Sequence, residues 1–292
     1  MHLTLQHGAY RAQVDTMGGE LISCRDGQGL EYIWQGDAAV WPGRNPLLFP
    51  IVGALADATV CFAGRAYRMQ RHGFARRQEF AVTGHGENWA ELELRDSPET
   101  RAAYPYPFRL RVRQTLGEGG FTTAVTVENP GPAELPFCLG AHTGFCCPLL
   151  PGERFEDYEL VFAQPETCPA LIPKGGGLDR GRTAPGLENA RVLPLRYETF
   201  DALDTLVFEG LRSRSVTLRH RTAGRGVRVD FSGFPVLALW TMPDKHAPYL
   251  CIEPWHGCPH MEGEGTEFTD KAYCIRLAPG AARTLSYRVA LL

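Results

Sequence analysis

The stretch Phe108-Arg109-Leu110-Arg111-Val112-Arg113 decides the fold class of this chain. Apolar side chains and arginines alternate in it without interruption. Successive side chains of a β-strand point to opposite faces, so this alternation predicts a strand with one buried and one hydrated face. Sheets with one wet face are typically antiparallel. The stretch therefore predicts a half-exposed antiparallel sheet.

The same pattern recurs along the chain and predicts strands at residues 89–95, 121–127, 216–218, 227–231 and 284–289. Two other runs, residues 236–240 and 249–252, are apolar on both faces and are expected to be buried central strands.

Turn-forming residues separate these segments. Asp26-Gly27 and Ala63-Gly64 lie between β-rich arms, as hairpin turns do. Helical periodicity is nearly absent, and the 32 glycines and 22 prolines among 292 residues favour turns over long helices. We therefore predict an all-β fold, a large and mainly antiparallel β-sandwich with few short helices.

Composition limits the domain organisation and the partners. No linker or repeat divides the chain, so one domain over residues 1–292 is expected, with residues 165–189 as a surface excursion that lacks strand character. The 30 Lys and Arg against 33 Asp and Glu give a net charge of -3, which provides no basic field for nucleic acid or a membrane surface. The residue pattern predicts no particular oligomeric state.

The pattern also indicates a compartment. The first residues do not resemble a signal peptide, and no apolar run is long enough to span a membrane. The nine cysteines are scattered rather than arranged as a dense disulfide framework. We expect a cytoplasmic protein with reduced cysteines.

Two histidines stand in short polar clusters beside apolar segments. His72 lies in Arg71-His72-Gly73-Phe74-Ala75-Arg76, where it is either a site residue or a hydrogen-bonded structural histidine. His142 lies in Gly140-Ala141-His142-Thr143-Gly144-Phe145, where its small neighbours leave room for a ligand, although a capping histidine in a tight turn is an equal reading.

A carboxylate ends an apolar run in Cys251-Ile252-Glu253-Pro254-Trp255. Glutamate is rarely buried without a partner. Glu253 therefore either pairs with an arginine such as Arg44 or Arg76, or acts as an acid or base in a cleft with Trp255 as a wall. Two histidines and a carboxylate suffice for proton transfer near neutral pH, so no cofactor is expected.

Competing motifs are weak. There is no nucleophile elbow, phosphate-binding loop or dinucleotide fingerprint. Residues 256–262 contain two histidines, a cysteine and a glutamate, but Pro259 interrupts them and their spacing matches no familiar zinc pattern. We expect a polar loop over the cleft and no metal. Cys146-Cys147 could supply a thiol nucleophile near His142, but core packing is the favoured interpretation.

Taken in order, several motifs resemble the aldose 1-epimerase (galactose mutarotase-like) family, in the branch of LacX-like proteins and hexose-6-phosphate mutarotase relatives. They are Gly18-Gly19-Glu20-Leu21, Glu31-Tyr32-Ile33-Trp34-Gln35-Gly36, Pro46-Leu47-Leu48-Phe49-Pro50-Ile51-Val52-Gly53, His72-Gly73-Phe74-Ala75-Arg76, Gly140-Ala141-His142 and Ile252-Glu253-Pro254-Trp255. The resemblance implies a β-supersandwich of the galactose mutarotase type, a sugar substrate, and interconversion of α and β anomers without a metal.

The resemblance also implies roles for individual residues. His142, Glu253 and His72 match the family's catalytic positions, with Glu253 as the base, His142 as the acid, and His72 holding the ring oxygen or a neighbouring hydroxyl group. The implied substrate-binding residues are Arg76, Asp204 or its near neighbour Asp201, Arg44, Trp255 and Trp34.

Two departures from the family pattern leave the phosphorylation of the sugar open. Arg44 precedes the Pro46–Pro50 run with a shorter spacing than in relatives that act on hexose 6-phosphates, and Thr143 stands where LacX-like chains often have proline. The alternatives to an aldose 1-epimerase are a hexose-6-phosphate mutarotase and a non-catalytic sugar-binding or sensing protein on the same fold.

Overall fold

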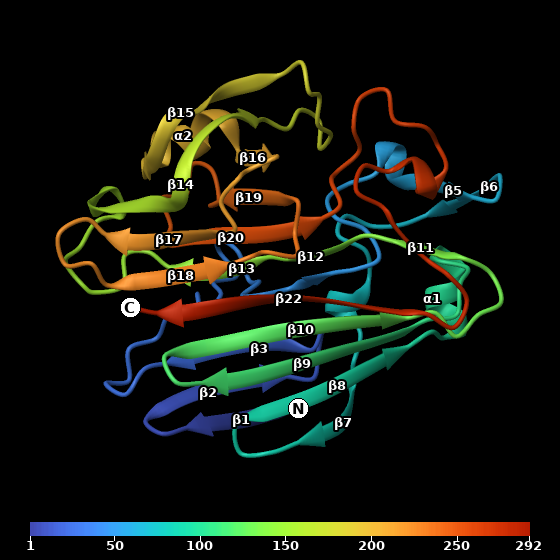
Figure 1. Cartoon of the computed structure of the whole chain (residues 1–292), viewed down its shortest axis with the longest axis horizontal. Coiled ribbons are helices and arrows are strands. Elements are labelled where there is room, and N and C mark those ends of the chain that lie inside the picture. The colour runs from blue at the N-terminus through green and yellow to red at the C-terminus, as the bar shows by residue number, and fades with distance from the viewer.

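The computed structural model describes residues 1–292 and is dominated by one antiparallel sheet of 15 strands (Figure 1). The sheet confirms the predicted all-β, mainly antiparallel architecture. In sheet order its strands are β4 (Leu47–Leu48), β12 (Leu139–Ala141), β20 (Tyr249–His256), β19 (Val236–Trp240), β16 (Thr205–Glu209), β14 (Tyr158–Leu171), β17 (Ser215–His220), β18 (Gly226–Asp230), β22 (Ala282–Leu291), β10 (Gly120–Glu128), β9 (Arg109–Gly117), β8 (Trp89–Arg95) and β7 (Ala81–His85), while β13 (Thr143–Cys146) pairs with β20 and β15 (Thr183–Pro194) pairs with β14.

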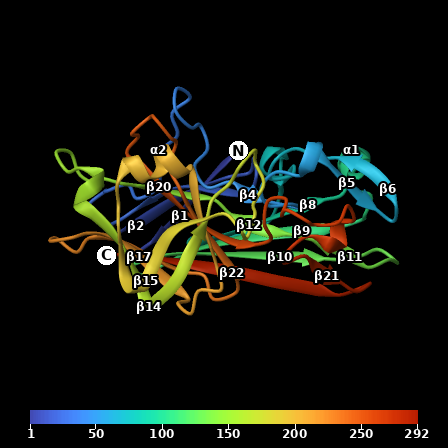
Figure 2. The same ribbon diagram turned by 90° about the horizontal axis from the view of Figure 1, so that it is seen from above.

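Smaller elements complete the fold. The remaining strands are β1 (His2–His7), β2 (Tyr10–Asp15) and β3 (Glu20–Arg25) in a three-stranded sheet, β5 (Thr59–Phe62) paired with β6 (Arg65–Arg68), and β11 (Leu135–Phe137) paired with β21 (Ile275–Leu277). The helices are α1 (Pro98–Ala103), α2 (Tyr197–Leu203) and the 3-10 turns η1 (Ala56–Ala58), η2 (Ala75–Arg77), η3 (Phe155–Asp157) and η4 (Phe268–Asp270). Seen from above in Figure 2, β14 and β15 lie at one end of the molecule, and α1, β5 and β6 lie at the other. None of the helices has the length and apolar character needed to cross a membrane.

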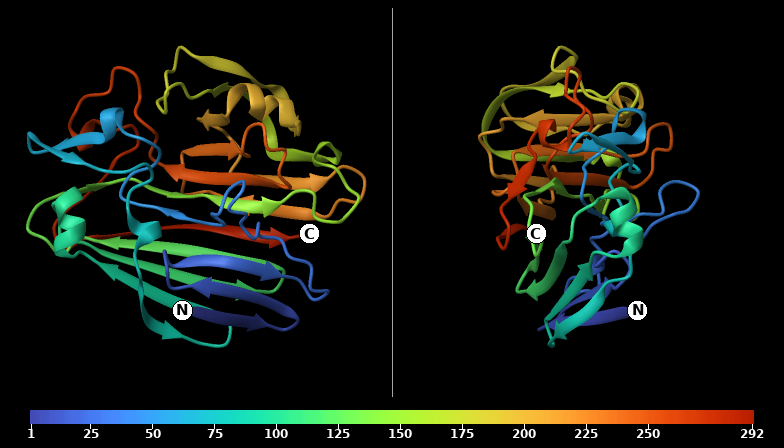
Figure 3. Two further views of the ribbon diagram at one scale, coloured as in Figure 1. Left: turned by 180° about the vertical axis from the view of Figure 1, so that it is seen from behind. Right: turned by 90° about the vertical axis from the view of Figure 1, so that its right-hand side faces the viewer.

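The alternating stretch from Phe108 onward forms β9 as predicted. Leu110 and Val112 are buried, and the three-stranded sheet β1–β3 packs on their side of β9 and β8, behind the green strands in Figure 1 and in front of them in the left view of Figure 3. The arginines face outward but are not simply hydrated, because they meet carboxylates on neighbouring strands: Arg109 Nη1 lies 2.9 Å from Glu128 Oε2. Charge pairing across strands thus supports the register on the wet face.

One expectation is wrong. Residues 165–189 are not a structureless excursion, because β14 and β15 form a long hairpin that includes both ends of this segment. The pairing contains three register shifts between Val161 and Ala170, and these interrupt the two-residue side-chain period that predicts a strand. The hairpin carries the loop of Lys174-Gly175-Gly176-Gly177 at its end.

The apolar runs form the central strands β19 and β20, which are almost wholly buried. The register of the sheet places Thr205 beside Trp240 and Trp240 beside Cys251. Polar residues at the ends of β16 and β19 therefore lie close to the middle of β20, although they are distant in the sequence. This arrangement positions the cleft described next.

Candidate active site

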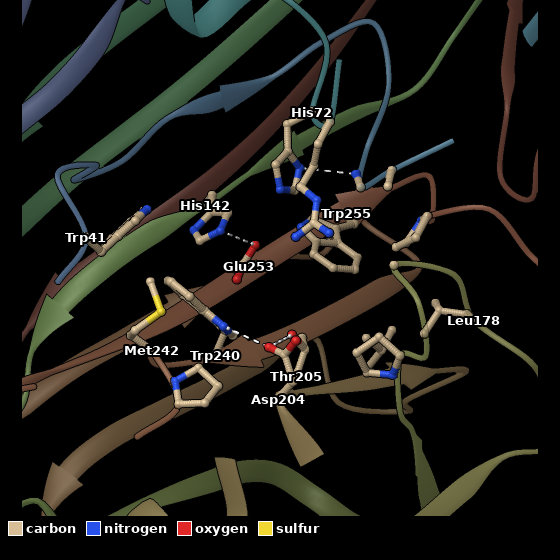
Figure 4. Close-up of a pocket in the computed structure, with 18 of the residues that line it drawn as sticks. Trp41, His72, His142, Leu178, Asp204, Thr205, Trp240, Met242, Glu253 and Trp255 are labelled. Carbon is tan, nitrogen blue, oxygen red and sulfur yellow. Dashed lines mark hydrogen bonds and ion pairs between the residues drawn. The ribbon is translucent and has the colours of Figure 1, made fainter. Parts of the chain in front are cut away.

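A cleft of about 420 Å³ lies over β16, β19 and β20 (Figure 4). Six residues named from the sequence line it together: His72, Arg76, His142, Asp204, Glu253 and Trp255. Arg71, Trp41, Trp240, Met242 and the loop glycines Gly175 and Gly176 complete much of its wall.

Glu253 lies in the middle of β20, opposite the small side chain of Ala238, and is only 1% exposed. His142 lies between β12 and β13, and the pairing of Thr143 with Ile252 brings it beside Glu253. The distance between His142 Nε2 and Glu253 Oε2 is 3.3 Å, within ion-pair range, but no donor is aligned for a hydrogen bond with Oε2. A titratable pair is thus held in contact without being locked by hydrogen bonds.

Burial changes the proton affinities of this pair in opposite directions. Removal from water raises the pKa of Glu253 well above its usual range, a rise that the nearby Trp255 indole opposes. The same effect, reinforced by the charge of Arg76, lowers the pKa of His142 to about 3. Burial therefore favours the uncharged form of both groups, a proton on the Glu253 carboxyl group and a neutral His142 imidazole.

His72 has a defined tautomer. Its Nδ1 accepts a hydrogen bond from the Gly53 backbone N–H at 3.1 Å, and burial, with a further contribution from His142, lowers the pKa of the ring well below its usual value. The neutral ring therefore carries its proton on Nε2. Its backbone has a φ of 66°, and the next residue must be glycine because a Cβ on Gly73 would collide with the Phe49 carbonyl.

Asp204 follows α2 with a φ of 63° and points its carboxylate into the cleft (Figure 4). One oxygen, Oδ1, accepts hydrogen bonds from Trp240 Nε1 at 3.0 Å and Thr205 Oγ1 at 3.1 Å. The other oxygen remains free for a ligand. Asp201 is engaged elsewhere, with His246 Nε2 at 2.8 Å and the Asp244 N–H at 2.7 Å, so the structure favours Asp204 between the two aspartates.

Two arginines, Arg71 and Arg76, line the cleft. Arg76 donates from Nη2 to the Arg71 carbonyl at 3.0 Å, and its Nε is buried without a partner. Neither Arg71 nor Arg76 forms an ion pair with a carboxylate in the structure. The sequence prediction included Arg76 and missed Arg71, although Arg71 stands in the same motif as His72.

Arg44 and Trp34 do not line the cleft, contrary to the expectation that they contact the sugar. The Arg44 guanidinium turns away and donates from Nε to the Gln35 carbonyl at 2.8 Å. The Trp34 ring stacks on Tyr249 at 4.8 Å between centroids and donates its N–H to the Trp41 carbonyl. Both side chains instead form hydrogen bonds with backbone carbonyls of residues 35–41.

The small residues around His142 make room for tryptophans. A Cβ on Gly140 would lie 2.8 Å from Trp255 Cδ1, and a Cβ on Gly144 would lie 2.8 Å from Trp41 Cζ3. Trp240 could have been suspected as the last residue of a predicted strand, whereas Trp41, in an irregular loop, has no sequence signal. The sequence therefore indicated Trp255 as part of the aromatic wall, but not Trp41 or Trp240.

Metal binding at this site is poorly supported by its donor set. Ligand atoms of His142, Cys251 and Glu253 lie within 4.8 Å of one another. Burial raises the pKa of the Cys251 thiol well above its usual value, and zinc takes cysteine as the thiolate. In the 256–262 loop, His256 Nδ1 faces the Tyr273 carbonyl at 2.9 Å and His260 Nδ1 faces Glu264 at 3.2 Å, so the two histidines serve separate contacts.

The adjacent cysteines are packed into the protein. Cys147 is fully buried, and burial raises the pKa of Cys146 to about 12. A thiolate nucleophile needs a lowered pKa, so neither cysteine is suited to act as a nucleophile.

Comparison with known proteins identifies relatives that match the whole chain. The chain is 37% identical to the plasmid-encoded protein LacX of Lactococcus lactis subsp. lactis, over 100% of both chains. A galactose mutarotase related enzyme from Lactobacillus acidophilus has a similar structure, with a TM-score of 0.94 and 27% identity over 100% of this chain and 97% of that one. A galactose mutarotase-like protein from Lactobacillus casei gives a TM-score of 0.91 and 27% identity over 100% of both chains.

The fold is therefore of the galactose mutarotase type, as the motifs implied. The match to the aldose 1-epimerase family extends over residues 1–290 and so includes every residue that lines the cleft. With its order of motifs, its architecture and its relatives in agreement, the chain belongs to the aldose 1-epimerase family.

Proposed function

We propose that the protein is an aldose 1-epimerase that interconverts the α and β anomers of an aldohexose or related sugar. The observation that carries the proposal is the contact between His142 and Glu253 in the cleft, two groups that can give and take one proton. A sugar-binding protein needs hydrogen bonds but has no need for a buried acid–base pair.

In the proposed reaction, the Glu253 carboxylate removes the proton of the C1 hydroxyl group while protonated His142 delivers a proton to the ring oxygen. The bond between C1 and the ring oxygen breaks, and C1 becomes an aldehyde carbon. After rotation about the C1–C2 bond, the same two protons return and the ring closes on the other face of C1. Protons and charge balance, because Glu253 gains the proton that the sugar loses and His142 supplies the proton that the sugar gains.

The protonation state of the pair suits this cycle. The contact of 3.3 Å allows the proton of Glu253 to pass to His142 when sugar hydroxyl groups donate hydrogen bonds to the carboxylate. The ionised pair is disfavoured by burial, so it is both a strong base and a strong acid once formed. Ring opening converts it back to the neutral pair, which burial favours. Burial therefore stabilises the state in which the sugar is open.

Four other residues would contact the sugar. His72 presents an Nε2–H to the ring oxygen or a neighbouring hydroxyl group, and Arg76 offers further donors. The free oxygen of Asp204 would accept hydrogen bonds from sugar hydroxyl groups, while Trp255 contributes a wall.

A phosphorylated aldose is the second candidate substrate. Arg71 and Arg76 both line the cleft, and neither has a carboxylate partner. Two guanidinium groups without counter-ions favour an anionic substituent on the sugar. Arg44, which the sequence offered for this role, lies outside the cleft and does not contribute.

The test is anomer exchange measured by NMR on matched free and 6-phosphorylated aldoses at anomeric equilibrium. We expect magnetisation transfer between the α and β signals to accelerate in proportion to the protein concentration. Arg71→Ala should lower the rate ratio of phosphorylated to free sugar by ~10-fold or more if the phosphate is the natural substituent. Binding of a sugar without any acceleration, for every sugar tried, would identify a non-catalytic binding protein and refute the proposal.

A further inference from the structure

The second ring nitrogen of His142 has no hydrogen-bond partner, although it is buried. A working imidazole usually has its tautomer and orientation set by a hydrogen bond on the nitrogen that does not react. His142 lacks this support on Nδ1, while its Nε2 faces Glu253. Another kind of contact must therefore hold the ring.

Aromatic rings surround His142 instead (Figure 4). The Trp41 indole stacks on its face with 5.0 Å between centroids and 28° between planes. Trp240 and His72 meet it edge to face, at 5.5 Å and 82° and at 5.6 Å and 83°. Of these three rings, only Trp41 is stacked on a face of the imidazole.

The position of Trp41 is itself closely defined. The Trp34 indole N–H donates to the Trp41 carbonyl at 3.0 Å, and the Tyr249 ring stacks on Trp41 at 5.3 Å and 25°. Cβ atoms on Gly43 and Gly144 would lie only 2.6 Å and 2.8 Å from the Trp41 ring. Any side chain at either glycine would thus displace the indole from the face of His142.

The face of an indole attracts a cation, and this attraction strengthens where water is excluded. The charged and titratable groups around His142 are Glu253 and Cys251 on β20 and His72 and Arg76 of the 71–76 segment. Burial and Arg76 both disfavour the imidazolium. Trp41 supplies a contact that favours it.

We propose that Trp41 is the positioning residue of the acid–base pair, holding the His142 imidazole in register with Glu253 and stabilising its protonated form. The proposal deepens the function proposed above and rests on it for its kinetic consequences. Because Trp41 also lines the cleft, the competing role is a platform on which the sugar stacks. Loss of a platform weakens sugar binding, whereas loss of a positioning contact slows the proton transfer.

The experiment compares Trp41→Leu and Trp41→Phe with the wild type by anomer-exchange NMR at several sugar concentrations. Trp41→Leu should lower kcat by ~10-fold with KM changed by less than ~2-fold, and Trp41→Phe, which keeps an aromatic face, should recover part of the loss. Trp89→Leu is the matched control. Trp89 lies on β8 against Arg113, away from the cleft, and its replacement should leave kcat unchanged.

A second readout does not depend on activity. In protein labelled with ¹⁵N-histidine, the two ring nitrogens of His142, assigned by their absence in His142→Asn, should show the widely separated signals of one tautomer. In Trp41→Leu the separation should shrink as the ring loses its fixed orientation, and Trp41→Phe should be intermediate. If Trp41→Leu does not fold, the same comparison is made with Trp41→Phe alone.

The outcomes separate the two proposals. A wild type that accelerates no anomer exchange refutes the proposed function, while the ¹⁵N signals still test the positioning role. An active wild type with kcat and ¹⁵N signals unaffected in Trp41→Leu and Trp41→Phe overturns the role of Trp41 alone. An increase in KM without a change in kcat also overturns it, in favour of a sugar platform.

Discussion

Replacing Glu253 by glutamine separates its proposed catalytic role from a structural one. Glu253→Gln keeps the size and hydrogen-bonding capacity of the side chain but removes the base. Anomer exchange should fall by ~10²-fold or more, the scale of a lost general acid or base. Sugar binding should survive better than turnover, because the residues that grip the sugar remain.

The same variant should lose activity but gain stability relative to wild type as the pH rises. Glu253 keeps its proton in the folded protein but loses it in the unfolded chain above about pH 4.3. In that range the folded state binds more protons, so wild-type stability falls as pH rises, by up to ~1.4 kcal/mol per pH unit until the folded pKa is reached. Glutamine is neutral in both states. The free energy of unfolding of Glu253→Gln relative to wild type should therefore increase with pH over this window.

Glu166→Gln is the matched control. Glu166 is 2% exposed, similar to Glu253, but lies outside the cleft. Its two oxygens accept backbone N–H groups of Arg212 at 3.1 Å and Ser213 at 2.6 Å, so an amide would set an NH₂ group against a donor. We expect this variant to lose ~1–3 kcal/mol of stability and to retain its exchange rate.

Denaturant unfolding at several pH values and anomer-exchange NMR on the same samples provide both measurements. If Glu253 were instead a buried structural ion, its neutralisation would destabilise the fold by ~3–5 kcal/mol at neutral pH. Such a loss, or an exchange rate equal to that of wild type, would refute the catalytic assignment.

Three further predictions concern the same site. His142→Asn should slow exchange by ~10²-fold or more, and the double variant with Glu253→Gln should be little slower than the slower single variant, since the two groups act as one unit; multiplicative losses in kcat would show that they act independently. Because burial lowers the pKa of His142 to about 3, its imidazole should stay neutral through the usual histidine range near pH 6.5 in the ligand-free protein; a titration of the ¹⁵N-labelled His142 ring near pH 6.5 would contradict this burial. Treatment with a chelator should leave exchange intact, and stoichiometric zinc whose removal abolishes activity would reverse this reading.

Site residues could be predicted from the sequence where their immediate neighbours indicate their environment. Glu253 was suspicious because a carboxylate stood in an apolar run, and β20 indeed buries it. His72 was singled out beside Gly73, whose contact with Phe49 now explains why glycine is needed there. The β14–β15 hairpin was missed because its bulges interrupt the two-residue period on which strand prediction depends.

Regular strands and family membership can be predicted from the sequence alone. Strands such as β9 follow from consecutive residues, since the alternation lies within one segment and is visible without its partner strand. Which side chains come into contact depends on the tertiary structure. The contact of His142 with Glu253 depends on the pairing of β13 with β20, and Asp204 was selected over Asp201 because Trp240 approaches it across the sheet while His246 occupies Asp201. The pKa shifts of His142 and Glu253 also depend on the tertiary structure, because segments far apart in the chain exclude water from both groups.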